Sequence, residues 1–253
     1  FERKLTLGKK ETGKHDPAVL DSLTESRLFK GTIWRLTGHF DKYAKDTNHL
    51  VFKLLKKIKG RPFFVFIHYS ETHMPYFLPR EFREKFLTSK VDKEPWNVNQ
   101  NHLKYYLGEV EMGPSDFKVL QALYDGAISY LDRRIFEIHS FVEKEGLLDD
   151  SMIIITSDHG DNLGEHGLLS HVFCLYDTLI RTPLLVKYPA DLNLSGVEDR
   201  VVQNTDLFPT IIDLLRGNCD KLHHQIQGNS LISSNITNRD YSYAISELVK
   251  PFG

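Results

Sequence analysis

The stretch Met152-Ile153-Ile154-Ile155-Thr156-Ser157-Asp158-His159-Gly160 decides the predicted fold of this chain of 253 residues. Its apolar half does not alternate with polar residues, which predicts a strand buried on both faces and hence a parallel sheet covered by helices. Its polar half places a carboxylate, an imidazole and a glycine at the carboxyl end of that strand. Because ligands bind at this edge of open α/β sheets, we expect a functional site directly after Thr156.

The segments around this strand alternate between helix and strand. An amphipathic run over residues 46–58 predicts a helix, and Pro62–Tyr69 predicts another strand that is buried on both faces. Apolar residues at steps of three and four predict a long helix between Ser115 and Gly146, and Pro183–Tyr188 predicts a third strand. The alternation predicts an α/β fold in which a mixed, mostly parallel sheet lies between layers of helices.

Composition and the order of these segments divide the chain into three regions. They are an irregular N-terminal segment, an α/β core and the start of a C-terminal region, at residues 1–46, 47–220 and 221–253. Residues 84–114 interrupt the core, and we expect this insert to carry substrate specificity, because specificity lies mostly in loops. A helix is expected over residues 208–215 and a last strand over residues 241–248.

Composition excludes several classes of protein. The 32 basic and 34 acidic residues give a formal net charge of -2, whereas proteins that bind nucleic acid through phosphate contacts need a basic surplus. The longest apolar runs, Phe63–Ile67 and Val172–Tyr176, are too short to span a membrane. Two cysteines are too few for a disulfide scaffold or a cysteine-rich zinc module. Because the chain begins at Phe1 rather than Met, we expect a piece of a longer protein, and localisation and oligomeric state stay open.

The turn after the isoleucine-rich strand could hold a divalent cation. Asp158 and His159 offer an oxygen and a nitrogen donor that can reach one ion. Asp161 and Glu165, which follow, are interpreted as acids at the N-terminus of a helix. On spacing alone, a second interpretation explains the same residues equally well: Asp158 caps the next helix and His159 packs against the core.

Four segments, in this order, resemble the sulfatase family of the alkaline-phosphatase superfamily, a group of metal-dependent hydrolases. They are a strand with a His-x-Pro-Tyr loop, a central helix, the Asp-His-Gly turn with the strand after it, and a later helix with its turn, at Phe64–Tyr76, Tyr124–Asp132, Ser157–Pro189 and Asp206–Leu231. The resemblance covers residues 47–248. It implies an α/β fold like that of alkaline phosphatases and sulfatases, with the N-terminal portion missing from this chain.

The resemblance also implies roles for individual residues. Asp158 and His159 match metal ligands of the family, and the ion is a divalent cation, often calcium, with manganese, magnesium or zinc in relatives. A histidine where many sulfatases have asparagine favours a transition metal. His73 and His171 match catalytic residues that contact the ester oxygens or protonate the leaving alcohol, with a surface histidine as the alternative for His171. His166 matches no usual ligand and is interpreted as orienting the ligand loop.

The nucleophile of a sulfatase has no match in these residues. The family oxidises a cysteine or serine in the pattern Cys/Ser-x-Pro-x-Arg to formylglycine, and neither Cys174 nor Cys219 stands in that pattern. We therefore expect the formylglycine, and the acidic ligands that complete the metal site, in the missing N-terminal part.

The expected function is that of a sulfatase-like metal-dependent hydrolase that cleaves sulfate esters, present here as an incomplete chain without its nucleophile. Its partner is a small sulfated, or alternatively phosphorylated, substrate. One alternative keeps the fold but changes the reaction to that of a phosphodiester or phosphonate-ester hydrolase or a phosphoethanolamine transferase. Another alternative is a non-catalytic remnant or binding module.

Overall fold

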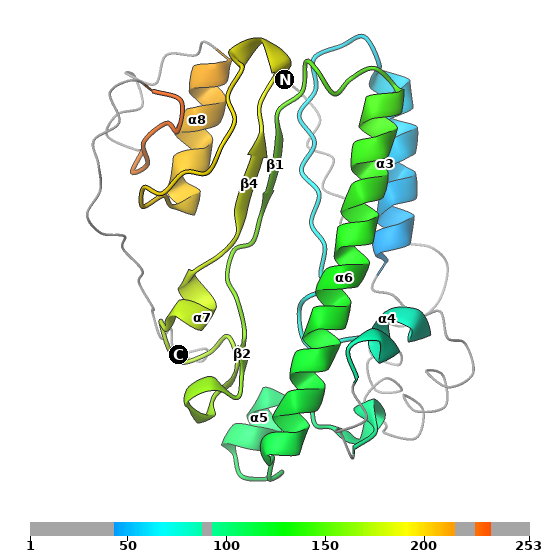
Figure 1. Ribbon diagram of the computed structural model, residues 1–253, viewed down its shortest axis with the longest axis vertical. Coiled ribbons are helices and arrows are strands. Elements are labelled where there is room, and N and C mark those ends of the chain that lie inside the picture. Colours follow the sequence, from blue (N-terminus) through cyan, green and yellow to red (C-terminus); the bar gives the residue numbers. More distant parts are fainter. Residues whose placement is uncertain (1–42, 88–92, 216–225, 234–253) are drawn as a thin grey trace, which may run out of the picture. The chain divides into compact units, whose positions relative to one another are not determined.

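The computed structural model describes residues 43–87, 93–215 and 226–233 (Figure 1). The chain forms two compact units, Phe1–Ile138 and His139–Gly253, whose boundary falls inside the long helix α6 (Pro114–Lys144). The strand expected over residues 241–248 and nearly all of the segment 1–46 lie outside the described residues. No helix in the described ranges is long and apolar enough to cross a membrane.

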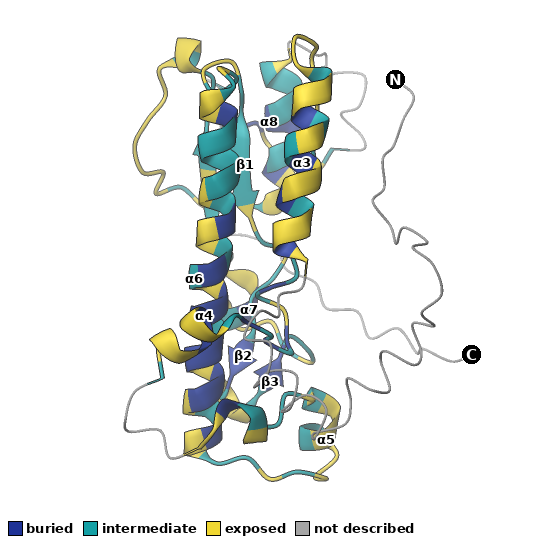
Figure 2. Cartoon of the chain, turned by 90° about the vertical axis from the view of Figure 1, so that its right-hand side faces the viewer, coloured by how far each residue is buried: buried dark blue, intermediate teal, exposed yellow. Residues whose placement is uncertain are grey.

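The described part of the first unit is mainly helical. Its helices there are α3 (Ala44–Ile58), α4 (Arg80–Lys85), η1 (Pro95–Asn97), α5 (His102–Tyr106) and the first part of α6. The amphipathic run predicted over residues 46–58 forms α3, which buries Val51 and Leu55 and exposes its lysines, so that buried and exposed colours alternate along it (Figure 2). Asn48 fastens α3 to α6, because its Nδ2 donates to the carbonyl of Arg134 at 2.8 Å.

The prediction of a buried strand over Pro62–Tyr69 is wrong. These residues pair with no strand in the described part of the chain, and Figure 1 draws them as an irregular segment without an arrow after α3. The side chains of Phe64 and Phe66 are 76% and 78% exposed. An apolar run predicts burial, but a strand forms only where a neighbouring backbone supplies hydrogen-bond partners.

The second unit contains two short sheets. β1 (Ile153–Thr156) pairs with β4 (Leu184–Lys187), and β2 (Asn162–Leu163) pairs with β3 (Leu169–Ser170). Strands form where the sequence predicts them after Ser151 and Pro183, but the predicted burial of the first strand on both faces is wrong, because residues 153–155 are half-buried and Thr156 is exposed. Both pairs are antiparallel, so the expected mostly parallel sheet is not found among the described residues. Parallel neighbours are usually joined by a crossover helix, whereas the chain between β1 and β4 forms the β2–β3 hairpin and only the short helix α7 (Asp177–Ile180).

A buried aspartate fastens the C-terminal side of the second unit. α8 (Leu207–Leu214) forms where the sequence predicts a helix, directly after Asp206. The Asp206 carboxylate is 2% exposed and accepts a hydrogen bond from the backbone N–H of Asn229 at 2.8 Å. A Cβ at Gly228 would lie 1.9 Å from the carbonyl oxygen of Thr205, so only glycine fits. The turn around Gly228 is thus held against the start of α8.

Candidate active site

The turn that follows β1 is held by polar contacts of its own residues and of Asn204. Ser157 Oγ donates to the carbonyl of His159 at 2.7 Å, and the backbone N–H of His159 donates to Asp158 Oδ1 at 3.1 Å. Asn204 Nδ2 donates to the carbonyl of Ser157 at 2.8 Å, and Thr156 Oγ1 donates to Asn204 Oδ1 at 3.1 Å. These contacts hold Asp158 and His159 next to each other at the carboxyl end of β1.

Gly160 lets this turn pass close to α7 (Asp177–Ile180). Its N–H donates to the carbonyl of Leu179 at 2.8 Å, and a Cβ at this position would lie 2.1 Å from the carbonyl oxygen of Thr178. Any larger residue would therefore displace α7 or the turn. The glycine of the Asp-His-Gly motif is required by backbone packing.

His159 presents one ring nitrogen to the Asp158 carboxylate. Its Nδ1 lies 2.8 Å from the carbonyl oxygen of Gly160, and since a carbonyl only accepts, Nδ1 carries a proton. In the neutral ring Nε2 then holds the lone pair, and it lies 3.9 Å from Asp158 Oδ2. Metal–ligand bonds of about 2.0–2.2 Å allow these two atoms to share one ion. The Asp158 side chain is 76% exposed, so the pair is accessible from solvent.

Asp161 and His171 meet across the β2–β3 hairpin. The register pairs Asn162 with Ser170, so the next position outward on each side is occupied by Asp161 and His171. His171 Nδ1 lies 3.0 Å from Asp161 Oδ1 and 3.2 Å from Ser170 Oγ. The side chain of Asp161 is 4% exposed and that of His171 is 26% exposed. The histidine predicted as catalytic is therefore paired with a nearly buried carboxylate.

His159, Asp161 and His171 form a cluster of three ligand-type side chains. The rings of His159 and His171 are stacked, with centroids 4.1 Å apart and planes at 28°. His159, Asp161 and His171 each offer a ligand atom, and these atoms lie within 4.8 Å of one another. The structure thus brings the predicted residues His159 and His171 together, and Asp158 lies outside this cluster with its Oδ2 3.9 Å from His159 Nε2.

Sequence reasoning missed the place of Asp161. The interpretation of this residue as an acid at a helix N-terminus is wrong, because it directly precedes strand β2. Glu165 does begin the short helix η2 (Glu165–Gly167), and its Oε2 accepts from the backbone N–H of Leu163 at 2.6 Å. Gly164 and Gly167 of the Gly-Glu-His-Gly stretch indicate that the chain reverses direction. A reversal at this point places Asp161 opposite His171.

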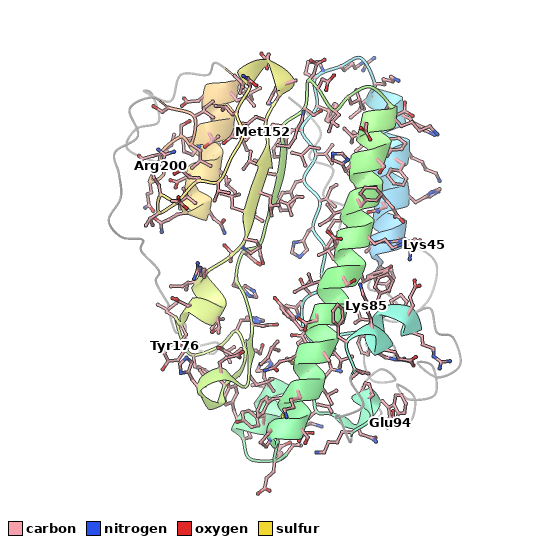
Figure 3. All side chains as sticks on the ribbon, in the orientation of Figure 1. Lys45, Lys85, Glu94, Met152, Tyr176 and Arg200 are labelled. Atoms are coloured by element: carbon pink, nitrogen blue, oxygen red, sulfur yellow. The ribbon has the colours of Figure 1, made fainter. Side chains whose placement is uncertain are left out.

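His166 and Asn162 shape the hairpin around this pair. The His166 ring stacks on Tyr176, labelled in Figure 3, with centroids 3.9 Å apart and planes at 20°. Asn162 is fully buried, and its Nδ2 donates to the carbonyl of Ser170 at 3.0 Å while its Oδ1 accepts from Thr178 Oγ1 at 2.6 Å. The amide of Asn162 therefore ties both strands of the hairpin to α7.

His73, the other predicted catalytic residue, lies in the first unit. Its Nδ1 contacts the carbonyl oxygen of Met74 at 2.5 Å. Asp158, His159 and His171 lie in the second unit. The convergence of His73 with these three residues stays a prediction.

Comparison with protein families gives a match over most of the chain. The family model described as Sulfatase matches residues 20–217. The chain belongs to the sulfatase family. This family is part of the alkaline-phosphatase superfamily and typically binds a divalent metal. The oxygen and nitrogen donors of Asp158 and His159 suit such an ion.

Two relatives resemble this sulfatase-family chain over about two thirds of its length. The multifunctional alkaline phosphatase superfamily protein PehA of Trinickia caryophylli is 24% identical over 204 residues, which cover 70% of this chain and 39% of that protein. The choline-sulfatase of Rhizobium meliloti (strain 1021) is 26% identical over 182 residues, which cover 68% of this chain and 35% of that protein. The chain thus spans less than half the length of these relatives.

A solved structure shows the same fold. The phosphonate monoester hydrolase of Agrobacterium radiobacter matches with a TM-score of 0.58 at 22% sequence identity, and the match covers 75% of this chain and 41% of that one. This is the fold that the sequence resemblance implies.

Proposed function

We propose that these 253 residues supply metal-binding and substrate-binding groups of an enzyme that hydrolyses sulfate esters of small molecules. Membership of the sulfatase family supports the reaction class. The observation that carries the proposal is the turn after β1, where Asp158 and His159 lie next to each other and His171 stacks on His159. A carboxylate, two imidazoles and solvent access in one place suit a metal-dependent hydrolase.

In this proposal Asp158 and His159 are the metal ligands. Asp158 Oδ2 and His159 Nε2, 3.9 Å apart, can share one divalent cation. A bound cation would act as a Lewis acid on the oxygens of the sulfate group. Calcium is the first candidate from the family, and manganese, magnesium and zinc are the others. The nitrogen donor favours manganese or zinc among them.

His171 and His73 are the catalytic residues in this proposal. Cleavage of a sulfate ester breaks the bond between sulfur and the bridging oxygen, and that oxygen takes up a proton. An imidazolium can donate this proton or neutralise charge on the other ester oxygens. The nucleophile, a formylglycine, is proposed to lie outside these residues, which contain no Cys/Ser-x-Pro-x-Arg pattern.

Hydrolysis of 4-nitrophenyl sulfate by the protein expressed from its complete gene tests this proposal. We expect metal-dependent release of 4-nitrophenol, and Asp158→Ala should lower kcat by about 10³-fold or more, because a metal ion supplies several kcal/mol of transition-state stabilisation. Asp177→Asn is the matched control, since Asp177 is an exposed carboxylate in the first turn of α7. Full turnover and unchanged metal content in Asp158→Ala would contradict the proposal.

A phosphate-ester or phosphonate-ester hydrolase is the second candidate function. The similarity to PehA, whose name places it in the alkaline-phosphatase superfamily as a multifunctional member, favours this candidate. The same assay with bis(4-nitrophenyl) phosphate and with a phenyl phosphonate ester separates the two. A higher kcat/KM for the sulfate ester supports the first proposal, and a higher value for a phosphorus ester supports the second.

A further inference from the structure

The meeting of Asp161 and His171 is set by the backbone. In the β2–β3 ladder Asn162 lies opposite Ser170 and Leu163 opposite Leu169, so Asp161 and His171 occupy the next opposed positions. Side chains at opposed positions of an antiparallel pair are close neighbours. The buried amide of Asn162 holds this hairpin in place through its hydrogen bonds to Ser170 and Thr178. The backbone therefore places the side chains of Asp161 and His171 opposite each other.

The contact between the two side chains has a defined direction. A carboxylate accepts hydrogen bonds and does not donate them. The 3.0 Å contact between His171 Nδ1 and Asp161 Oδ1 therefore requires the proton on Nδ1, and Ser170 Oγ, at 3.2 Å, can accept from the same N–H. The Asp161 side chain is 4% exposed, so water competes little for this hydrogen bond.

We propose that Asp161 is a positioning residue that holds His171 in the Nδ1–H tautomer and in one ring orientation. Nε2 of His171 is then the nitrogen that exchanges a proton or hydrogen bond with a bound ester. The tautomer does not depend on the proposed function, whereas its consequence for ester cleavage does. His159 has the same arrangement, since its Nδ1 donates to the carbonyl of Gly160, so the two stacked rings present the same nitrogen.

Nitrogen NMR of the protein expressed from its complete gene tests the tautomer directly. A long-range ¹H–¹⁵N correlation at about pH 8.5 distinguishes protonated from unprotonated ring nitrogens, and His171→Gln identifies the His171 signal among those of the other histidines. We expect a protonated Nδ1 and an unprotonated Nε2 in the wild type. In Asp161→Ala the Nε2–H form should become the major one, and the control Asp177→Asn should change nothing.

Two results would overturn this inference. One is an Nε2–H tautomer of His171 in the wild-type chain, a measurement that needs no variant. The other is an unchanged His171 signal in Asp161→Ala with native backbone dispersion. Should that variant fail to fold, Asp161→Asn keeps the shape of the side chain and should give a mixture of both tautomers, and a spectrum like the wild type would again refute the inference.

Kinetics of the protein expressed from its complete gene separate a positioning role from a metal-binding one. We expect Asp161→Ala to lower kcat about 10- to 100-fold, with KM and metal content unchanged. Loss of the metal would make Asp161 a ligand together with His159 and His171 and would refute the positioning role. Absence of any hydrolysis in the wild type would count against the proposed function but would leave the tautomer result intact.

Discussion

Each unit contains a cluster of hydrogen-bonded polar side chains, and the two clusters differ in their exposure to solvent. In the first unit Asn48, 1% exposed, donates to the carbonyl of Arg134 and to Glu137 Oε2 and accepts from Tyr69 Oη. In the second unit the cluster of His159, Asp161 and His171 is partly open to solvent. We call these the buried network and the open cluster. Buried polar groups that satisfy one another stabilise packing, whereas ligand-type groups that reach solvent can bind.

The largest expected effect comes from a substitution that disrupts only the open cluster. His159→Ala removes the nitrogen donor next to Asp158 and the ring on which His171 stacks. We expect turnover of 4-nitrophenyl sulfate to fall about 10³-fold, because a metal ion contributes several kcal/mol to such reactions. The free energy of unfolding should change by less than about 1 kcal/mol, since this side chain is 36% exposed. If His159→Ala lost stability but kept its turnover, His159 would be a structural residue and not a metal ligand.

The second prediction breaks the buried network alone. Asn48→Ala removes the hydrogen bonds that its buried amide makes to the Arg134 carbonyl and to Glu137, which should lower the free energy of unfolding by about 2–3 kcal/mol. Urea unfolding followed by circular dichroism measures the change, and Lys53→Ala, on the exposed side of α3, is the control within about 0.5 kcal/mol. Equal stability of wild type and Asn48→Ala would show that the network does not hold α3 on α6.

The third prediction links packing to the open cluster. Gly160→Ala brings a Cβ against the carbonyl of Thr178, so either the turn or α7 must move. We expect a cost of about 1–3 kcal/mol in unfolding free energy, together with weaker metal binding, because His159 is adjacent. Thermal unfolding and metal titration of the same sample measure both effects. A variant with wild-type stability and metal affinity would mean that Gly160 does not position the turn.

The smallest expected effect is on the pH dependence of stability, and it arises from Tyr69 in the buried network. Burial, followed by the carboxylates of Glu71 and Glu137, raises the pKa of Tyr69 to about 12. The folded state therefore holds the phenol proton more tightly than the unfolded state, with its ordinary pKa of about 10. Stability from this source is complete below about pH 10 and is lost as the pH rises through about 12. In Tyr69→Phe the unfolding midpoint should fall less steeply over this range, and identical slopes would refute the assignment.

The sequence predicts the local elements of this molecule better than their pairing. Helices α3, α6 and α8 and strands β1 and β4 arise from periodicity, apolar runs and caps, which act over short distances. The direction of the β1–β4 pair and the exposed run Pro62–Tyr69 depend on which backbone lies alongside, and no local pattern encodes that.

In the candidate site, too, a residue could be placed from the sequence only where a local pattern determines its position. Asp158 and His159 follow a strong strand signal, so their position at its end could be predicted. Asp161 could not be placed beside His171, because β2 and β3 are each two residues long and too short to show a periodic pattern. The short hairpin, which brings this pair together, becomes visible only in the structure.

Titration of Mn²⁺ into the metal-free protein expressed from its complete gene, followed by calorimetry, tests the central claim that the turn after β1 holds a divalent cation. We predict one bound ion in the wild type and in Asn48→Ala, and an affinity at least about tenfold lower in Asp158→Ala, since only the last variant removes a proposed ligand. Equal affinity in wild type and Asp158→Ala would contradict the claim.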